Sequence, residues 1–288
     1  MTSFVGAHLN KDKTYLKTLN NIKNLNGTAI QMFISSPLSN TIVDIEKFKD
    51  DNDISEIINF CNINKIKLVI HGPYILNLAK EFKINKRVID IEDCLWINII
   101  LNQLMIADLL NAVGVVIHVG KSTTLTNENA LDNMKRAISY IISKMDKKTN
   151  VKLILETPAG QGTELLTNMN DFFDFYNSFS DKEKHYLKIC IDTCHIWNAG
   201  YDINDYYNNI PKNNIDDILV IHLNNSKTDI NQRKDRHEEL FKGKIYINSF
   251  KTFLSNLNND TIIILEKPAP SPLELSKEIK WINKHLLK

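Results

Sequence analysis

Ile189-Cys-Ile-Asp-Thr-Cys-His195 is the stretch of sequence from which the fold can be inferred. It completes an apolar strand that ends at Asp192, and we expect the histidine to lie in the loop beyond that strand. An aspartate at the tip of a buried strand and a histidine three residues later cannot both point at one spot without a bend in the backbone. Two ligands that point slightly apart would suit two different metal ions. Whether other strands end in the same way therefore decides both the fold and the chemistry.

Short apolar runs alternate with longer helical patterns along the whole chain. Several runs are continuous in Ile, Val and Leu, which is typical of parallel strands buried on both faces. We expect strands at residues 4–8, 29–33, 67–71, 114–118, 152–156, 187–192, 217–222 and 261–266. We expect helices at residues 51–64, 93–113, 127–147, 170–180, 247–258 and 272–285, and a solvated loop in the Asn-rich segment 204–214. Eight strand–helix units predict an α/β fold, a single (β/α)8 TIM barrel over residues 1–288.

The predicted strands have metal-ligand residue types at their ends. Six consecutive strands, the third to the eighth, finish on His71, His118, Glu156, Asp192, His222 and Glu266. In a TIM barrel the C-terminal ends of the strands surround one cavity, so these side chains would converge. A single histidine at a strand end is more often a hydrogen-bonded residue with no ligand role. Because the chain has only 8 histidines, six such ends in succession predict a metal site at the C-terminal face of the barrel.

The ligand types also indicate the kind of metal. A set of His, Asp and Glu without thiolates favours zinc or a similar divalent ion at a catalytic site. Six ligands exceed the three protein ligands of an ordinary catalytic zinc, so we expect at least two ions, bridged most naturally by Glu156. His195, Asp235 and His237 could form a third site. An Asp-x-His sequence in a charged loop is, taken alone, more often solvated surface.

Composition excludes little. The chain has 288 residues, 43% of them hydrophobic, with a net charge of +1, so a nucleic-acid enzyme would have to gather its basic residues locally. Such a cluster follows the seventh strand: Lys227, Arg233, Lys234, Arg236, Lys242 and Lys244. The sequence lacks a membrane-spanning apolar run, a signal-peptide layout and a disulfide framework. We expect a monomer without membrane association in an intracellular, cytoplasmic or nuclear, compartment, or at a viral replication site or in a virion if a large DNA virus encodes it.

Five motifs resemble those of one known family. They are Gly6-Ala-His8, His71-Gly-Pro-Tyr74, Leu155-Glu-Thr-Pro-Ala-Gly-Gln-Gly162, the segment Cys190 to Asp202, and His222-Leu-Asn-Asn-Ser-Lys227 with Asp235-Arg-His237. Together they resemble the endonuclease IV family of apurinic/apyrimidinic (AP) endonucleases, trinuclear zinc enzymes on a (β/α)8 barrel. The resemblance covers essentially the whole chain, and long motifs with fixed spacing are specific.

The resemblance implies three zinc ions per chain, with Mn²⁺ as a substitute at some sites. One ion would be held by His71, His118 and the bridging Glu156. A second would be held by Glu156, Asp192, His222 and Glu266, and a third by His195, Asp235 and His237. Glu156, Asp192 and Glu266 are the expected catalytic carboxylates.

The implied activity is hydrolysis of the phosphodiester 5′ to an abasic site in duplex DNA, which leaves a 3′-hydroxyl and a 5′-deoxyribose phosphate. A 3′-repair diesterase activity on blocked 3′ ends is implied too. The expected DNA contacts are Gln31, Leu38, Tyr74, Ile75, Lys227, Arg233 and Arg236. This chain departs from the family at Leu38, where an inserted Arg is usual, and at Asn225, where Asp is usual.

Two other functions remain open from the sequence. A metal-dependent sugar isomerase or epimerase would also place Glu, Asp and His at the strand ends of such a barrel, but it would need fewer ligands and no Asp235/His237 pair. A protein that binds abasic sites without cutting them would not need the intact ligand set. Metal content and an incision assay separate the three possibilities.

Overall fold

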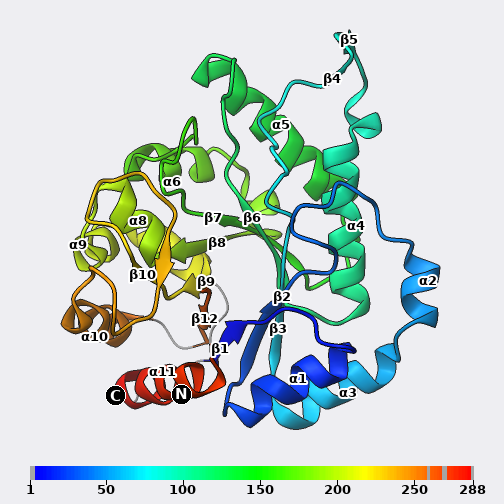
Figure 1. Cartoon of the computed structure of the whole chain (residues 1–288). Coiled ribbons are helices and arrows are strands. Elements are labelled where there is room, and N and C mark those ends of the chain that lie inside the picture. The colour runs from blue at the N-terminus through cyan, green and yellow to red at the C-terminus, as the bar shows by residue number, and fades with distance from the viewer. Residues whose placement is uncertain (1–3, 258–259, 268–270, 287–288) are drawn as a thin grey trace.

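The computed structural model describes residues 4–257, 260–267 and 271–286, and its centre is a closed parallel barrel (Figure 1). The strand order around the barrel is β1-β12-β9-β8-β7-β6-β3-β2. The barrel strands are β1 (Phe4–His8), β2 (Ala29–Met32), β3 (Lys67–His71), β6 (Gly114–His118), β7 (Lys152–Glu156), β8 (Leu187–Asp192), β9 (Ile218–His222) and β12 (Ile262–Leu265). The predicted TIM barrel is therefore confirmed.

Two apolar layers hold the barrel together, because successive residues of each strand point to opposite faces. One buried layer fills the barrel interior with side chains from most of the strands: Ala29, Val69, Val116, Ile154, Cys190, Val220, Ile262 and Ile264. The neighbouring strand residues, such as Leu68, Ile70 and Leu153, belong to the larger core shared with the surrounding helices. The strands are therefore buried on both faces, and polar side chains at their C-terminal ends are held in a rigid frame.

Helices surround the barrel. They are α1 (Tyr15–Asn24), α2 (Ile45–Asp50), α3 (Ile54–Asn64), α4 (Leu95–Leu109), α5 (Asn127–Lys144), α6 (Met169–Asn177), α7 (Asp181–Lys184), α8 (Thr193–Ala199), α9 (Ile203–Asn208), α10 (Ile247–Asn256) and α11 (Pro272–Leu286). The six predicted helices correspond to α3, α4, α5, α6, α10 and α11, mostly with shorter ends. The predicted end of the helix at 247–258 lies outside the described residues. No helix in the described ranges combines the length and hydropathy that a membrane crossing needs.

The structure corrects the sequence predictions in several places. His195 lies in the first turn of α8 rather than in a loop, because the side chain of Asp192 caps that helix. The segment 204–214 is not a solvated loop: it contains most of α9 and the start of the 3-10 helix η2 (Lys212–Asp217), and Tyr206 and Asn214 are buried in it. Asp217 ends η2 instead of opening β9. Glu266 follows β12 directly rather than ending it.

Two short hairpins lie outside the barrel. The first pairs β4 (Lys83–Ile84) with β5 (Arg87–Val88) and projects away from the barrel in Figure 1. The second pairs β10 (Asn225–Ser226) with β11 (His237–Glu238) and so brings His237 back towards the end of β9. Strands of two residues give no periodicity in the sequence, which is why neither hairpin was predicted.

Candidate metal centre

The predicted ligands lie together at the C-terminal end of the barrel. His71, His118, Glu156, Asp192 and His222 are the last residues of their strands, and Glu266 is the first residue after β12. The pairing of β6 with β7 sets His118 beside Glu156, and the pairing of β8 with β9 sets Asp192 beside His222. The barrel register therefore places these side chains at one level.

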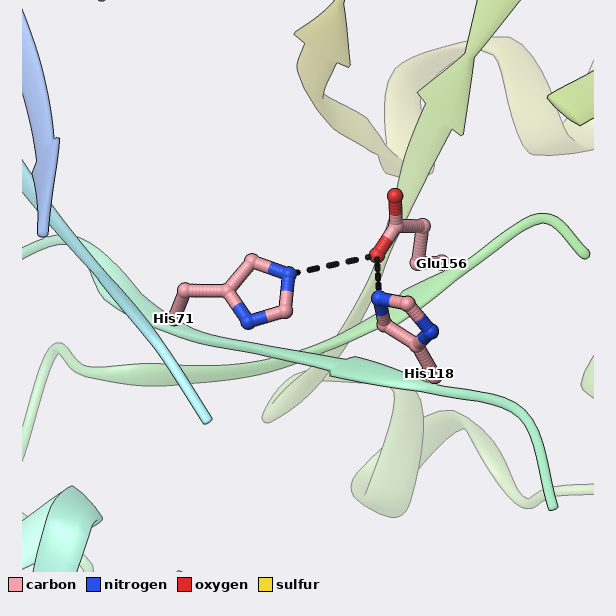
Figure 2. A group of neighbouring side chains, drawn as sticks. All are labelled: His71, His118 and Glu156. Atoms are coloured by element: carbon pink, nitrogen blue, oxygen red, sulfur yellow. Dashed lines mark ion pairs between the residues drawn. The ribbon is translucent and has the colours of Figure 1, made fainter. Parts of the chain in front are cut away.

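His71, His118 and Glu156 form the first group (Figure 2). Nε2 of His71 lies 3.5 Å from Oε2 of Glu156, and Nε2 of His118 lies 3.2 Å from the same oxygen. Both imidazoles point at one carboxylate oxygen from different strands (Figure 2). These three side chains are the set expected for one ion.

Glu156, Asp192, His222 and Glu266 form the second group, in which one ligand atom of each lies within 4.8 Å of the others. Nδ1 of His222 lies 2.8 Å from Oε1 of Glu156 and 3.1 Å from Oε2 of Glu266. Glu156 therefore faces the first group through Oε2 and the second through Oε1. This is the arrangement that a bridging carboxylate needs.

The third group joins α8 to the loop before β11. Oδ1 of Asp235 lies 3.3 Å from Nε2 of His195 and 3.0 Å from Nε2 of His237. The carboxylate of Asp192 lies 3.4 Å from His237, and Asp192, His195 and His237 could also hold an ion together. The nine predicted ligands thus form one continuous cluster.

Hydrogen bonds orient the histidine rings. Nδ1 of His71 faces the carbonyl of Gly72, that of His195 faces Thr157 and that of His237 faces Glu266. A carbonyl oxygen can only accept, so these rings must carry their proton on Nδ1, which leaves Nε2 free to bind a metal. His222 is the reverse case, because its Nε2 lies 2.9 Å from Oε1 of Gln31 and its Nδ1 faces the carboxylates.

The cluster contains opposite charges that shift each other's pKa. Burial acts to raise the pKa of Glu156, but His118 and His222 outweigh it and hold this pKa well below its usual value. Burial likewise acts to lower the pKa of His195, but Asp192 and Asp235 raise it well above the usual value. Without metal, protonated imidazoles would therefore balance the negative charge of the buried carboxylates. Bound metal cations at the same places would balance that charge too.

Unpaired polar atoms test whether the site fits metal ions. Among the residues that the structure describes, buried side-chain atoms without a hydrogen-bond partner include Nε2 of His71, His195 and His237, and Oε2 of Glu156. Buried polar atoms normally have a hydrogen-bond partner, whereas these four face only charged groups of the same cluster. All four are predicted ligand atoms that point into the cluster. The residues present therefore fit a set of bound divalent ions.

Sequence reasoning missed the residues that orient the ligands. Asn224 donates to Asp192 at 2.6 Å and accepts from the backbone N–H of Glu266 at 2.7 Å. The Thr157 hydroxyl accepts from the backbone N–H of Asp192 at 3.0 Å. Asn224 lies two residues after His222, and Thr157 lies directly after Glu156, so both stand beside a predicted ligand inside two of the quoted motifs, which is the signal that the sequence offered.

The candidate DNA contacts fall into two classes. Gln31 is fully buried and bonds His222 and His8, so its side chain faces the ligands and not the exposed rim. The other six reach the surface. Leu38, Tyr74 and Ile75 are 72%, 43% and 45% exposed, respectively, and the Tyr74 hydroxyl reaches Glu266 at the end of the barrel. Lys227, Arg233 and Arg236 are exposed in the loop between β10 and β11.

A parallel barrel with a cluster of His, Asp and Glu at its C-terminal end defines a TIM-barrel protein with a candidate metal centre. The family model described as a xylose isomerase-like TIM barrel matches residues 19–285, so the chain belongs to that family. Within it, the chain is 31% identical over 280 residues to the "Probable endonuclease 4" of Sulfurihydrogenibium sp. (strain YO3AOP1), which is 94% of this chain and 95% of the relative. The chain is thus a member of the endonuclease IV family.

Solved structures agree on the fold. Endonuclease IV from Thermus thermophilus superposes with a TM-score of 0.75 and 23% identity, over 98% of each chain. A D-tagatose 3-epimerase-like protein superposes with a TM-score of 0.71 and 19% identity, again over 98% of each chain. Because a nuclease and an epimerase-like protein share this barrel, the fold alone does not decide the reaction.

Proposed function

We propose that this protein is a zinc-dependent AP endonuclease that hydrolyses the phosphodiester 5′ to an abasic site in duplex DNA. The products would be a 3′-hydroxyl and a 5′-deoxyribose phosphate, and blocked 3′ ends would be substrates for a 3′-repair diesterase activity. The observation that carries this proposal is the third ligand group. His195, Asp235 and His237 extend the cluster beyond the six strand-end ligands, and three ions per chain become chemically reasonable.

The chain's own residues would divide the work as follows. The three ligand groups would hold divalent ions, whose chemistry at such a site would be to lower the pKa of water and to neutralise charge on the phosphodiester. Glu156, Asp192 and Glu266 hold negative charge around the first two groups and fix the relative position of those groups, since Glu156 faces both. Tyr74 donates to Oε1 of Glu266 at 3.1 Å and so limits the positions that this carboxylate can take.

The rim next to the site suits a damaged duplex. The backbone N–H of Tyr74 donates to the carbonyl of Pro37, which joins the loop that carries Leu38 to the loop that carries Ile75. Two exposed aliphatic side chains are thereby held on adjacent loops beside the ligands. Apolar side chains inserted at a base step stabilise a kinked duplex, and an abasic nucleotide is cheap to extrude because it lacks stacking and pairing. Leu38 and Ile75 are the proposed wedge.

Basic residues would hold the backbone of the DNA. Lys227 and Arg236 line the same cleft as His8, Tyr74, His237 and Glu266. Phosphate contacts from Lys and Arg supply most of the sequence-independent affinity of such proteins for DNA. Charge near the ligands therefore supports a nucleic acid rather than a neutral sugar as the substrate, and this argues against the epimerase alternative.

The test is incision of a duplex with one abasic analogue, with and without a chelator, beside an undamaged duplex. We expect cleavage of the damaged strand only, its loss after chelation and its return when zinc is added back. Extension of the upstream fragment by a polymerase would identify the 3′-hydroxyl. Tight binding without incision would assign the protein to lesion recognition, and interconversion of ketoses by the metal-loaded protein would assign it to the epimerases.

A further inference from the structure

The third ligand group is assembled from two segments that differ in rigidity. His195 lies in α8, directly after a barrel strand, and its position is set by the strand and by the cap from Asp192. Asp235 lies in the connection from β10 to β11, whose residues 227–236 have no helix or strand, and His237 opens β11, where it pairs with Ser226 of β10. This connecting loop, residues 227–236, must be held against α8 for the three ligands to meet.

Asn198 lies at the junction of these two segments. It is fully buried in α8, three residues after His195, so it is about one helical turn away. Its Nδ2 donates to Oγ of Ser226 at 3.0 Å and to the carbonyl of Cys194 at 2.9 Å. The side chain therefore connects the helix to the residue that precedes the connecting loop.

The side-chain oxygen of Asn198 reaches both ends of the loop. Oδ1 accepts from the hydroxyl of Thr228 at 2.7 Å and from the backbone N–H of Lys234 at 3.4 Å. The backbone carbonyl of Asn198 accepts a hydrogen bond from the N–H of Arg233 at 3.0 Å. Lys234, whose N–H bonds the side-chain oxygen, directly precedes the predicted ligand Asp235. One amide thus fixes the start and the end of the segment that carries the ligand.

An asparagine suits this position because its side chain offers two donors and an acceptor oxygen in one plane. Aspartate would direct an oxygen, which cannot donate, at the carbonyl of Cys194. Leucine has a similar volume but would leave the hydroxyl of Thr228 and the N–H of Lys234 without their acceptor. Either substitution would remove side-chain hydrogen bonds that hold the loop against α8, while the barrel ligands stay in place.

We propose that Asn198 is a positioning residue for the third metal ion, because it holds Asp235 and His237 at the distance from His195 that a shared ion requires. This inference rests on the proposed three-metal function. It assigns no contact with substrate or metal to Asn198 itself. Loss of its amide should weaken one ion selectively and leave the ions held by the strand-end ligands bound.

The experiment measures zinc in the full chain without DNA. After dialysis at low free zinc, metal content per chain and the affinity of each site are determined by competition with a chelating dye. We expect three ions in the unsubstituted protein. In Asn198→Leu we expect two tight ions and a third weakened about 10–100-fold, as when other partners of metal ligands are removed. Thr228→Val, a milder change, should weaken the same ion by a smaller factor.

Asn214→Leu is the matched control. Asn214 is also fully buried, and its amide exchanges two hydrogen bonds of 3.0 and 2.8 Å with Asn177. The Asn214→Leu variant should lose stability, as Asn198→Leu does, but it should still bind three zinc ions tightly. Unchanged zinc affinities in both Asn198→Leu and Thr228→Val would overturn the proposal, as would equal weakening of all three ions in them. Fewer than three ions in the unsubstituted protein would instead contradict the proposed function.

Discussion

Oε1 of Gln31 lies 2.9 Å from Nε2 of His222, while Nε2 of Gln31 lies 3.0 Å from Nδ1 of His8. The glutamine thereby fixes which nitrogen of His222 carries the proton and leaves Nδ1 to face Glu156 and Glu266. A residue that the sequence placed among the DNA contacts is thus bonded to a predicted metal ligand. A substitution of Gln31 can separate a role in DNA contact from a role in orienting His222.

Gln31→Leu should weaken zinc at the second group, because His222 loses the acceptor that fixes its tautomer. Partners of this kind contribute about 10–100-fold to metal affinity. A competition titration measures the loss, and binding of an abasic duplex at saturating zinc should stay within a few-fold of normal. Gln103→Leu is the control, since Gln103 is equally buried but has no side-chain hydrogen bond among the described residues. If Gln31→Leu had normal zinc affinity but weakened DNA binding, Gln31 would be a DNA contact after all.

Glu156→Gln should reduce incision by more than about a hundredfold, the upper effect of partners that only orient a ligand. The carboxylate faces His71, His118 and His222 at once, so its loss disturbs two groups. Zinc content should fall in the same variant. Glu274→Gln, which changes a partly exposed glutamate paired with Lys242, should incise at the normal rate. Near-normal turnover of Glu156→Gln would contradict a bridging role.

Zinc affinity of the third group should depend on pH. Burial acts to lower the pKa of His237, but Asp192 and Asp235 outweigh it and raise this pKa to about 9 in the metal-free site. Zinc must displace that proton, so affinity should fall at least about tenfold for each pH unit below 9, and more steeply where His195, whose pKa is also raised, gives up a second proton. Titrations between about pH 7 and 9 check the slope. A flat profile would show that His237 gives up no proton on binding.

Leu38→Ser and Ile75→Ser should each weaken binding to an abasic duplex by about tenfold or more, because full burial of such a side chain contributes about 1.5–3 kcal/mol. Zinc content should be unaffected. Ile63→Ser, at a residue 71% exposed on α3, controls for the loss of a surface aliphatic group. Equal DNA affinity in all three variants would exclude the proposed wedge.

Glu278→Ala should destabilise the fold by about 3–5 kcal/mol, the usual effect of breaking a buried ion pair. The carboxylate lies 2.7 Å from Nζ of Lys267, with both side chains buried, and it also accepts the backbone N–H of Leu240 at 2.8 Å. Urea unfolding measures the loss. The control Glu274→Ala breaks a surface pair and should cost at most about 1 kcal/mol. A loss for Glu278→Ala no larger than that of the control would contradict the prediction.

The strand-end positions of the candidate ligands could be predicted because they follow from local sequence. An apolar run buried on both faces ends where a polar residue appears, and the barrel brings all such ends to one face. The strands that end in His71, His118 and Glu156 were therefore predicted with the bounds that the structure has. The helical position of His195 was missed. The helix α8 begins directly after the strand with a cap from Asp192, and a cap produces no apolar periodicity that the sequence could reveal.

The sequence by itself determined the barrel, the residue types of the ligands and the resemblance to endonuclease IV. Only the tertiary structure decided which ring nitrogens face the site, that Gln31 serves His222, and that Asn198 holds the loop that carries Asp235. The reason is physical: these relationships are hydrogen bonds between residues as far apart as 191 positions for Gln31 and His222. Strand and helix patterns depend on neighbours along the chain, whereas such contacts exist only once the barrel has closed.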